Sequence, residues 1–417
     1  MIYDPFQKKA IAAIDEEKSV LVSAPTGAGK TAIAEYAIVK ALSRDERVIY
    51  TAPIKALSNQ KYRDFSVRYP DKVGLLTGDV SLNADAPIVI MTTEIYRNQL
   101  FEDPERLKNT AWVIFDEVHY LDDVERGTVW EEAIMFSPEH IRFVALSATA
   151  PNVEELAQWI RGILNHPIDV IIETHRPVPL VHLFQCQGKV YDDPRDLRKD
   201  GYLGRDIWPS LFGGGNFGRR DRFSKRGHER SLRARPNRTD DLIRHLVQEK
   251  RLPCLYFCFG RKRAEELAWE QGKFDFLDPE EKKEIEALYQ KLCERFDLVH
   301  EASAADLKRI ILNGIAFHHA GMLPTLKEVI EQLFTSKLIK LIFTTETFAL
   351  GINMPAKTVV FDELRKFYGT HFANLRTRDY FQMAGRAGRR GMDSAGFVYS
   401  RINPHQIPFP AVNRIMY

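Results

Sequence analysis

The sequence has 417 residues, which exceeds one ordinary hydrophobic core and predicts two domains. Its composition, 44% apolar and 28% charged, is that of an ordinary soluble protein. The net charge of +2 neither supports nor excludes a nucleic-acid partner, because such a partner needs only local basic surface. No apolar run approaches the length that spans a membrane, and the start, MIYDPFQKKA, has no apolar signal region. We therefore expect a cytoplasmic protein, or a nuclear one in a eukaryote, with no membrane partner.

Short apolar runs alternate with helical patterns over the first 175 residues. Such alternation is typical of βαβ units around a parallel sheet, so residues 1–175 are predicted to form the first α/β domain. The predicted strands lie at 20–22, 48–50, 88–90, 112–115 and 143–146. The predicted helices lie at 30–43, 54–67, 93–101 and 152–162.

A glycine-rich segment at 24–31 follows the first strand and precedes the first of these helices. Glycines let backbone N–H groups converge on phosphate oxygens, and the helix N-terminus adds partial positive charge. The segment therefore predicts an ATP site, with Lys30 on the β and γ phosphates and the Thr31 hydroxyl on Mg²⁺. Its predicted nucleotide-binding residues are Pro25, Thr26, Gly27, Ala28, Gly29, Lys30 and Thr31.

Two acidic residues, Asp116 and Glu117, follow the apolar strand at 112–115. Strand ends of open α/β sheets face the ligand crevice, so Asp116 is predicted to hold Mg²⁺. Glu117 is predicted to orient and deprotonate the attacking water.

The alternation stops at about residues 191–238, where apolar residues are few and arginines many. This stretch predicts a mobile basic insertion, either a solvated loop or an auxiliary RNA-binding tether. Alternation then resumes with a helix at 239–250 and strands at 255–257 and 340–343, so residues 176–417 are predicted to form a second α/β domain. Residues 278–295 predict a helix with a solvated charged face. Four cysteines without CxxC spacing predict buried free thiols.

The segment 382–391, QMAGRAGRRG, carries two arginines three positions apart. On a helix, Arg386 and Arg389 would share a face and could neutralise charge on the γ-phosphate. The alternative is a solvated basic helix end.

The string DEVHYLDDVERGTVWEEAI, followed by Ser147-Ala148-Thr149 and Pro151-Asn152, closely resembles the superkiller-like DExH-box RNA helicases of superfamily two. The resemblance runs from Tyr3 to Asp393 and implies two tandem RecA-like domains with ATP in the cleft between them. It also implies 3′-to-5′ movement on single-stranded RNA, as a monomer, with protein cofactors or a nuclease complex as partners.

The resemblance assigns roles to individual residues. Phe6 and Gln7 match the adenine-binding segment, while Gly351 and Asn353 would face nucleotide. Gln382 would contact the γ-phosphate, and Arg386 and Arg389 would act as arginine fingers. Coupling between ATP and strand movement falls to His119, Ser147 and Thr149. The strand-binding residues would be Pro53, Lys55, Ala56, Thr92, Thr93, Arg261, His319, Thr344 and Thr345.

Two other functions stay open. One is a DNA helicase of the related archaeal repair type, and the other is an ATP-gated RNA clamp that does not unwind. The family's core is usually followed by winged-helix and helical domains, which this sequence does not contain. From the sequence we expect RNA-stimulated ATP hydrolysis with weak unwinding of long duplexes.

Overall fold

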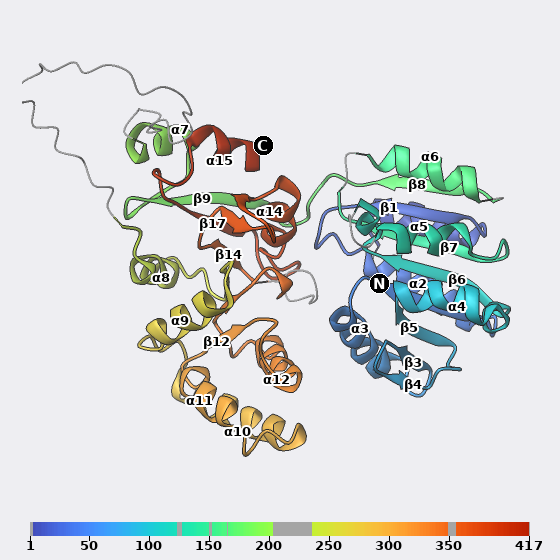
Figure 1. The fold of residues 1–417 in the computed structure, drawn as a ribbon, viewed down its shortest axis with the longest axis horizontal. Coiled ribbons are helices and arrows are strands. Elements are labelled where there is room, and N and C mark those ends of the chain that lie inside the picture. Colours follow the sequence, from blue (N-terminus) through green and yellow to red (C-terminus); the bar gives the residue numbers. More distant parts are fainter. Residues whose placement is uncertain are drawn as a thin grey trace, which may run out of the picture. The chain divides into compact units, whose positions relative to one another are not determined.

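The computed structural model describes residues 3–122, 127–149, 152–164, 166–202, 236–348 and 356–416. These residues fall into two compact units, of which the first ends at Pro177 and the second begins at Val178. Each unit is an α/β sheet of mainly parallel strands, so the predicted α/β class is confirmed (Figure 1). Within the described ranges, no helix combines the length and the apolar composition that crossing a membrane requires.

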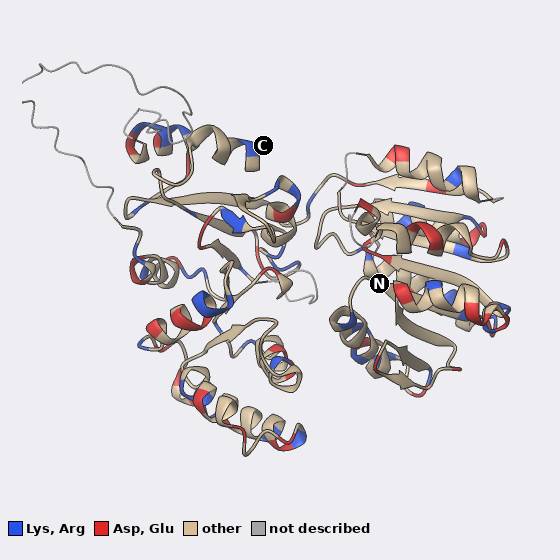
Figure 2. Cartoon of the chain, in the orientation of Figure 1, with Lys and Arg blue, Asp and Glu red and all other residues tan. Residues whose placement is uncertain are grey.

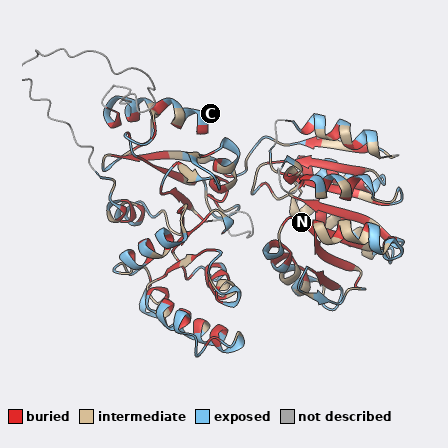
Figure 3. Cartoon of the chain, viewed as in Figure 1, coloured by how far each residue is buried: buried red, intermediate tan, exposed pale blue. Residues whose placement is uncertain are grey.

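The first unit contains one sheet in which every described strand pair is parallel except β3–β4. In sheet order the strands are β4 (Ser81–Leu82), β3 (Val73–Leu76), β5 (Ile88–Thr92), β2 (Arg47–Ala52), β6 (Thr110–Asp116), β7 (Arg142–Ser147), β1 (Ser19–Ser23) and β8 (Ile168–Ile172). The central strands are buried along their whole length, as near-continuous apolar runs predict (Figure 3).

Helices cover both faces of this sheet. α1 (Pro5–Asp15), α2 (Thr31–Leu42) and α3 (Lys55–Arg68) contribute to the core on one face. α4 (Thr93–Glu102), α5 (Gly127–Met135) and α6 (Val153–Ile163) contribute to the core on the other. α6 shows why they pack this way: Val153, Ala157 and Ile160 recur at helical spacing and are buried, while acidic residues occupy its first turn. Short 3₁₀ turns, η1 (Pro104–Leu107) and η2 (Val118–Asp122), complete the unit.

The second unit repeats this plan, with an antiparallel β9–β10 pair at one sheet edge. In sheet order its strands are β10 (Lys189–Tyr191), β9 (Leu180–Cys186), β17 (Gly396–Ile402), β14 (Thr358–Phe361), β11 (Cys254–Phe257), β13 (Leu341–Thr344) and β12 (Ile315–His318). A separate hairpin joins β15 (Arg365–Phe367) and β16 (Phe372–Asn374). The helices are α7 (Pro194–Asp196), η3 (Leu197–Gly201), α8 (Thr239–Gln248), α9 (Arg261–Gln271), α10 (Pro279–Arg295), α11 (Ala302–Ile311), α12 (Pro324–Thr335), α14 (Thr377–Ala384) and α15 (Phe409–Met416).

One prediction for this unit needs correction. The stretch predicted to be mobile from residue 191 is packed as far as Tyr202, whose hydroxyl donates to the Ile407 carbonyl at 2.8 Å. Leu197 in the same stretch is fully buried, and residues 203–235 lie outside the described residues. The helix α10, for which a solvated charged face was predicted, buries Ile285, Tyr289 and Leu292 on its other face. The four cysteines are buried free thiols, as predicted.

Val144 on β7 and Val67 on α3 offer a matched test of the core in the first unit. Val144 is fully buried and Val67 is 85% exposed. We expect Val144→Ala to lower the free energy of unfolding by about 2 kcal/mol, because it leaves a cavity. Val67→Ala should change it by less than about 0.5 kcal/mol. Urea unfolding followed by the fluorescence of the buried Trp112 and Trp130 measures both, and equal effects would contradict the assigned core.

Candidate functional site

Most of the residues predicted to act on nucleotide or strand in the first unit lie at one edge of its sheet. Parallel strands place their carboxyl ends together, and the register pairs Ala52 with Thr92 and Ser23 with Ser147. The segments that follow β5 and β2, which are neighbours in the sheet, carry the predicted strand-binding groups. Those that follow β6, β7 and β1 carry the predicted catalytic, coupling and nucleotide-binding groups.

The glycine-rich segment forms a loop between β1 and α2. Gly27 and Gly29 adopt φ of +84° and +94°, values that side-chain-bearing residues rarely adopt. The Lys30 ammonium lies against the loop and donates to the carbonyls of Ala24 at 2.7 Å and Pro25 at 3.3 Å. The lysine ammonium is therefore held against the backbone carbonyls at the start of the loop.

Gln7 connects α1 to this loop. Its Nε2 donates to the Gly29 carbonyl at 2.8 Å, and its Oε1 accepts from the Asp4 N–H at 2.8 Å. Gln7 and Phe6 are both buried. The amide thus positions the phosphate loop, and its predicted contact with adenine stays a prediction.

The end of β6 places Asp116 close to Thr31. Tyr50 donates to Asp116 Oδ2 at 2.5 Å, and the Lys61 ammonium lies 3.9 Å from the same oxygen and 3.4 Å from Thr31 Oγ1. Burial raises the pKa of Asp116, against the opposing effects of Lys61 and the Tyr50 hydroxyl. Lys61 was not predicted, because a lysine within helix α3 carries no motif. Its buried ammonium marks a cation position between the two predicted metal ligands.

Glu117 follows with φ of +60°, an unfavourable backbone conformation for a residue with a side chain. Its carboxylate lies 3.4 Å from His119 Nδ1, the same nitrogen that faces the Ala148 N–H at 3.4 Å. One nitrogen cannot donate to Glu117 and accept from Ala148 at once, so the His119 tautomer selects between them. Ser147 is buried and Thr149 is exposed. The predicted coupling residues therefore lie beside the predicted base.

Arg176 is a second residue that the sequence interpretation missed. Its Nη1 donates to the Thr26 carbonyl in the phosphate loop at 2.7 Å. Burial lowers the pKa of Arg176 to about 10, which still leaves it protonated at neutral pH. It was overlooked because it lies beyond residue 175, where the first domain was predicted to end.

The predicted strand-binding groups of the first unit lie close together. Lys55, at the start of α3, forms an ion pair with Asp79, in the segment that follows β3. Lys55 and Ala56 are exposed, whereas Pro53 is buried. Thr92 and Thr93 are buried at the junction of β5 and α4, so their backbone is what this edge can offer to a phosphate.

In the second unit, His319 is held by the protein through both ring nitrogens. Nε2 lies 2.7 Å from Glu265 Oε1, and Nδ1 accepts from the Gly321 N–H at 3.1 Å. Burial lowers the pKa of His319, although Glu265 opposes this effect. The ring therefore orders the loop beside Arg261, whose side chain is exposed at the start of α9.

Thr344 and Thr345 differ in what their hydroxyl groups contact. Thr344 is fully buried and its hydroxyl donates to the His318 carbonyl at 2.8 Å. Thr345 Oγ1 lies 2.9 Å from Thr347 Oγ1 at the carboxyl end of β13. Of the two threonines, Thr345 is the one placed at the edge.

The two predicted arginine fingers do not share a helix face, which corrects the sequence-based geometry. α14 ends at Ala384, and Ala387 forms a β-bridge with Ala356. Arg386 is buried, while Arg389 donates to both carboxylate oxygens of Asp393, at 2.7 and 2.9 Å. Gln382 is half-buried on α14. Gly351 and Asn353 lie outside the described residues.

A phosphate loop between β1 and α2, an acidic pair after β6 and two α/β units together define a P-loop nucleotide-binding protein. A model of DEAD/DEAH box helicases matches residues 4–156, and a model of the helicase conserved C-terminal domain matches residues 292–391. Such domains imply ATP binding. The chain belongs to the DExH-box RNA helicases, in their superkiller-like branch. This is the family that the sequence motifs resemble.

Curated relatives are similar to nearly the whole chain. Exosome RNA helicase MTR4 of Homo sapiens is 42% identical over 414 residues, which cover 98% of this chain and 39% of that protein. DExH-box ATP-dependent RNA helicase DExH9 of Arabidopsis thaliana is 40% identical over 97% of this chain and 42% of its own length. Superkiller complex protein 2 of Mus musculus is 42% identical over 95% of this chain and 32% of its own length. The chain thus spans between 32% and 42% of the length of these three relatives.

Arg176 gives a direct test of the phosphate loop. We expect Arg176→Ala to weaken ATP binding by about tenfold, because the loop loses a charged hydrogen-bond donor. Titration with a fluorescent ATP analogue measures the affinity. Arg161→Ala, which removes an exposed arginine from α6 in the same unit, is the control. Equal affinities for the two variants would exclude Arg176 from the site.

Proposed function

We propose that this chain is the core of an ATP-dependent RNA helicase that couples ATP hydrolysis to 3′-to-5′ movement on single-stranded RNA. Its activity would remodel duplexes or ribonucleoproteins in RNA processing or decay. The observation that carries the proposal is the single sheet edge of the first unit, where nucleotide-binding and strand-binding groups follow neighbouring strands. A change at the phosphate loop can therefore reach the strand-binding segments through a few backbone contacts.

Magnesium suits the oxygen donors at this edge, the Asp116 carboxylate and the Thr31 hydroxyl, with phosphates and water as further ligands. The Lys61 ammonium, close to both groups, supports this proposal because it places a positive charge beside them. Bound magnesium would neutralise phosphate charge.

The side chains of this protein then have separate roles in ATP hydrolysis. Lys30 neutralises the phosphates, and Glu117 accepts the proton of the attacking water. Gln382, Arg386 and Arg389 are proposed to act on the γ-phosphate. His119 would couple the protonation of Glu117 to the segment that contains Ser147 and Thr149. Its Nδ1 faces both the Glu117 carboxylate and the Ala148 N–H in that segment.

Glu117→Gln tests the proposed base. The amide keeps the shape of the side chain but cannot accept a proton, so turnover should fall by about a hundredfold or more while ATP affinity stays unchanged. Steady-state phosphate release and nucleotide titration measure the two quantities. Lys30→Ala should abolish both, and normal turnover by the Glu117 variant would remove that residue from the mechanism.

The proposed substrate is tested by comparing RNA and DNA oligonucleotides of one sequence as activators of the ATPase. We expect RNA to stimulate hydrolysis more strongly than DNA. Equal or stronger stimulation by DNA would favour the repair-type DNA helicase. A strand-displacement assay run in parallel separates a helicase from an ATP-gated clamp, which would hydrolyse ATP without displacing a strand.

The partners proposed are single-stranded RNA and, as protein partners, cofactors or a nuclease complex. The names of two relatives, an exosome RNA helicase and a superkiller complex protein, support this choice. Pull-down of nuclease subunits with the chain would test it.

A further inference from the structure

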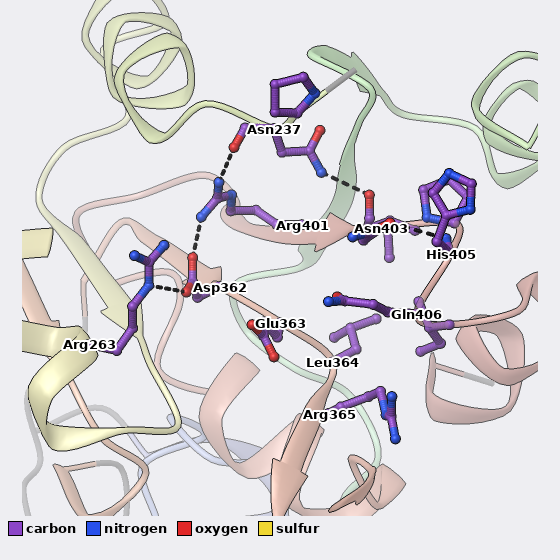
Figure 4. Close-up of a pocket in the computed structure, with 14 residues that line it drawn as sticks. Asn237, Arg263, Asp362, Glu363, Leu364, Arg365, Arg401, Asn403, His405 and Gln406 are labelled. Carbon is purple, nitrogen blue, oxygen red and sulfur yellow. Dashed lines mark hydrogen bonds and ion pairs between the residues drawn. The ribbon is translucent and has the colours of Figure 1, made fainter. Parts of the chain in front are cut away.

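A cavity of about 550 Å³ opens at the carboxyl ends of β14 and β17 in the second unit (Figure 4). None of the predicted nucleotide-binding or strand-binding residues lines it. Its walls come from the segments after the two strands, from the start of α9 and from the residues that precede α8. The volume lies within the range of roughly 300–1,000 Å³ that is typical of sites for small ligands.

The floor of the cavity is a buried ion pair. The Arg401 and Asp362 side chains are only 8% and 6% exposed, and Asp362 also accepts from the Tyr256 hydroxyl at 2.8 Å. Arg401 Nε donates to Gln185 at 3.0 Å, and another of its N–H groups donates to the Asn237 carbonyl. A buried ion pair adds little net stability, because desolvation offsets the attraction. The contacts of Arg401 nevertheless join β17 to β9, to the end of β14 and to the residues before α8. The floor is therefore preorganised.

The rim offers hydrogen-bonding groups to a ligand. Arg263 uses Nε to bind Asp362 at 3.1 Å, which leaves the outer nitrogens of its half-exposed side chain pointing outward. Within the part of the chain that the structure describes, no hydrogen bond or ion pair engages the side chains of Arg365, Glu363 and Gln406. Guanidinium groups suit a phosphate, while an amide and a carboxyl group suit the polar edge of a base.

The cavity continues the edge that carries the predicted strand-binding groups. β12, β13, β11, β14 and β17 are successive neighbours in one sheet, and the register aligns Phe257 of β11 with Phe361 of β14. Arg263 lies two residues after Arg261 in the basic first turn of α9 (Figure 2). A strand that crosses the ends of β12, β13 and β11 therefore reaches the cavity along the same edge.

We propose that this cavity binds one nucleotide of the RNA strand, beyond the contacts made by the helicase motifs. Arg365 and the outer nitrogens of Arg263 hold its phosphate, and Gln406 and Glu363 hydrogen-bond the base. The proposal rests on the proposed function. A polypeptide segment would satisfy the apolar lining, but the two available guanidinium groups favour a phosphodiester.

The test uses the full chain with Arg365→Ala, and Arg309→Ala as the matched control. Arg309 is 78% exposed on α11 of the same unit, so its loss removes the same charge away from the cavity. Affinity is measured for labelled single-stranded RNAs of increasing length over a series of salt concentrations. Arg365→Ala should weaken binding of the longer RNAs by about tenfold and lower the salt slope by about one, while the shortest RNAs bind unchanged.

A second variant, Gln406→Ala, should weaken the longer RNAs without changing the salt slope, because it removes no charge. Unchanged thermal unfolding midpoints exclude a folding defect in either variant. The proposal is overturned if Arg365→Ala follows Arg309→Ala at every RNA length, which is also the outcome if a polypeptide occupies the cavity. If the unmodified chain binds no RNA and RNA does not stimulate its ATPase, the proposed function itself fails.

Discussion

The hydrogen-bond register of the parallel strands is the constraint on which the candidate site depends. Each pair in the first unit aligns its carboxyl ends within about a residue, as Asp116 beside Leu146 and Ala52 beside Thr92 show. A slip by one position would turn every side chain to the opposite face of the sheet. His119 would then no longer face the Ala148 N–H, and the loop at Lys30 would lose its place beside Asp116. The backbone of the sheet thus positions the side chains that are proposed to act on the nucleotide.

The sequence was sufficient to predict five strands of the first unit (β1, β2, β5, β6 and β7) and the helices α2, α3, α4 and α6, whereas β3, β4, β8, α1 and α5 were not predicted. The helix predicted at 93–101, for example, is α4 (Thr93–Glu102). Such helices are predictable because the spacing of apolar residues indicates which face is buried. Contacts between distant segments leave no such local pattern, so Lys61 beside Asp116 and Arg176 on the phosphate loop were not found. The shared helix face of Arg386 and Arg389 failed because spacing alone does not show where a helix ends. In that segment the bridge between Ala387 and Ala356 replaces helical hydrogen bonding.

The side chains of several motif residues form hydrogen bonds within the protein. Gln7 holds Gly29, Thr344 holds the His318 carbonyl, and His319 holds Gly321 while bound to Glu265. A motif locates such residues correctly but does not show whether the side chain or the backbone it orders meets the ligand. The exposed Lys55 and Arg261 are the side chains at these two edges that remain directed outward. Backbone contacts of this kind suit binding that is independent of base sequence.

The bidentate pair between Arg389 and Asp393 has a consequence for the entropy of ligand binding. An arginine side chain loses up to about 2 kcal/mol of rotational freedom when it becomes ordered. Asp393 fixes the guanidinium through Nε and Nη2, so this loss is incurred when the domain folds. An anion that meets Arg389 finds the side chain already ordered. Binding of the anion then exchanges one negatively charged partner of Arg389 for another. The free energy of this exchange depends on the strengths of the two ion pairs and contains little further loss of side-chain entropy.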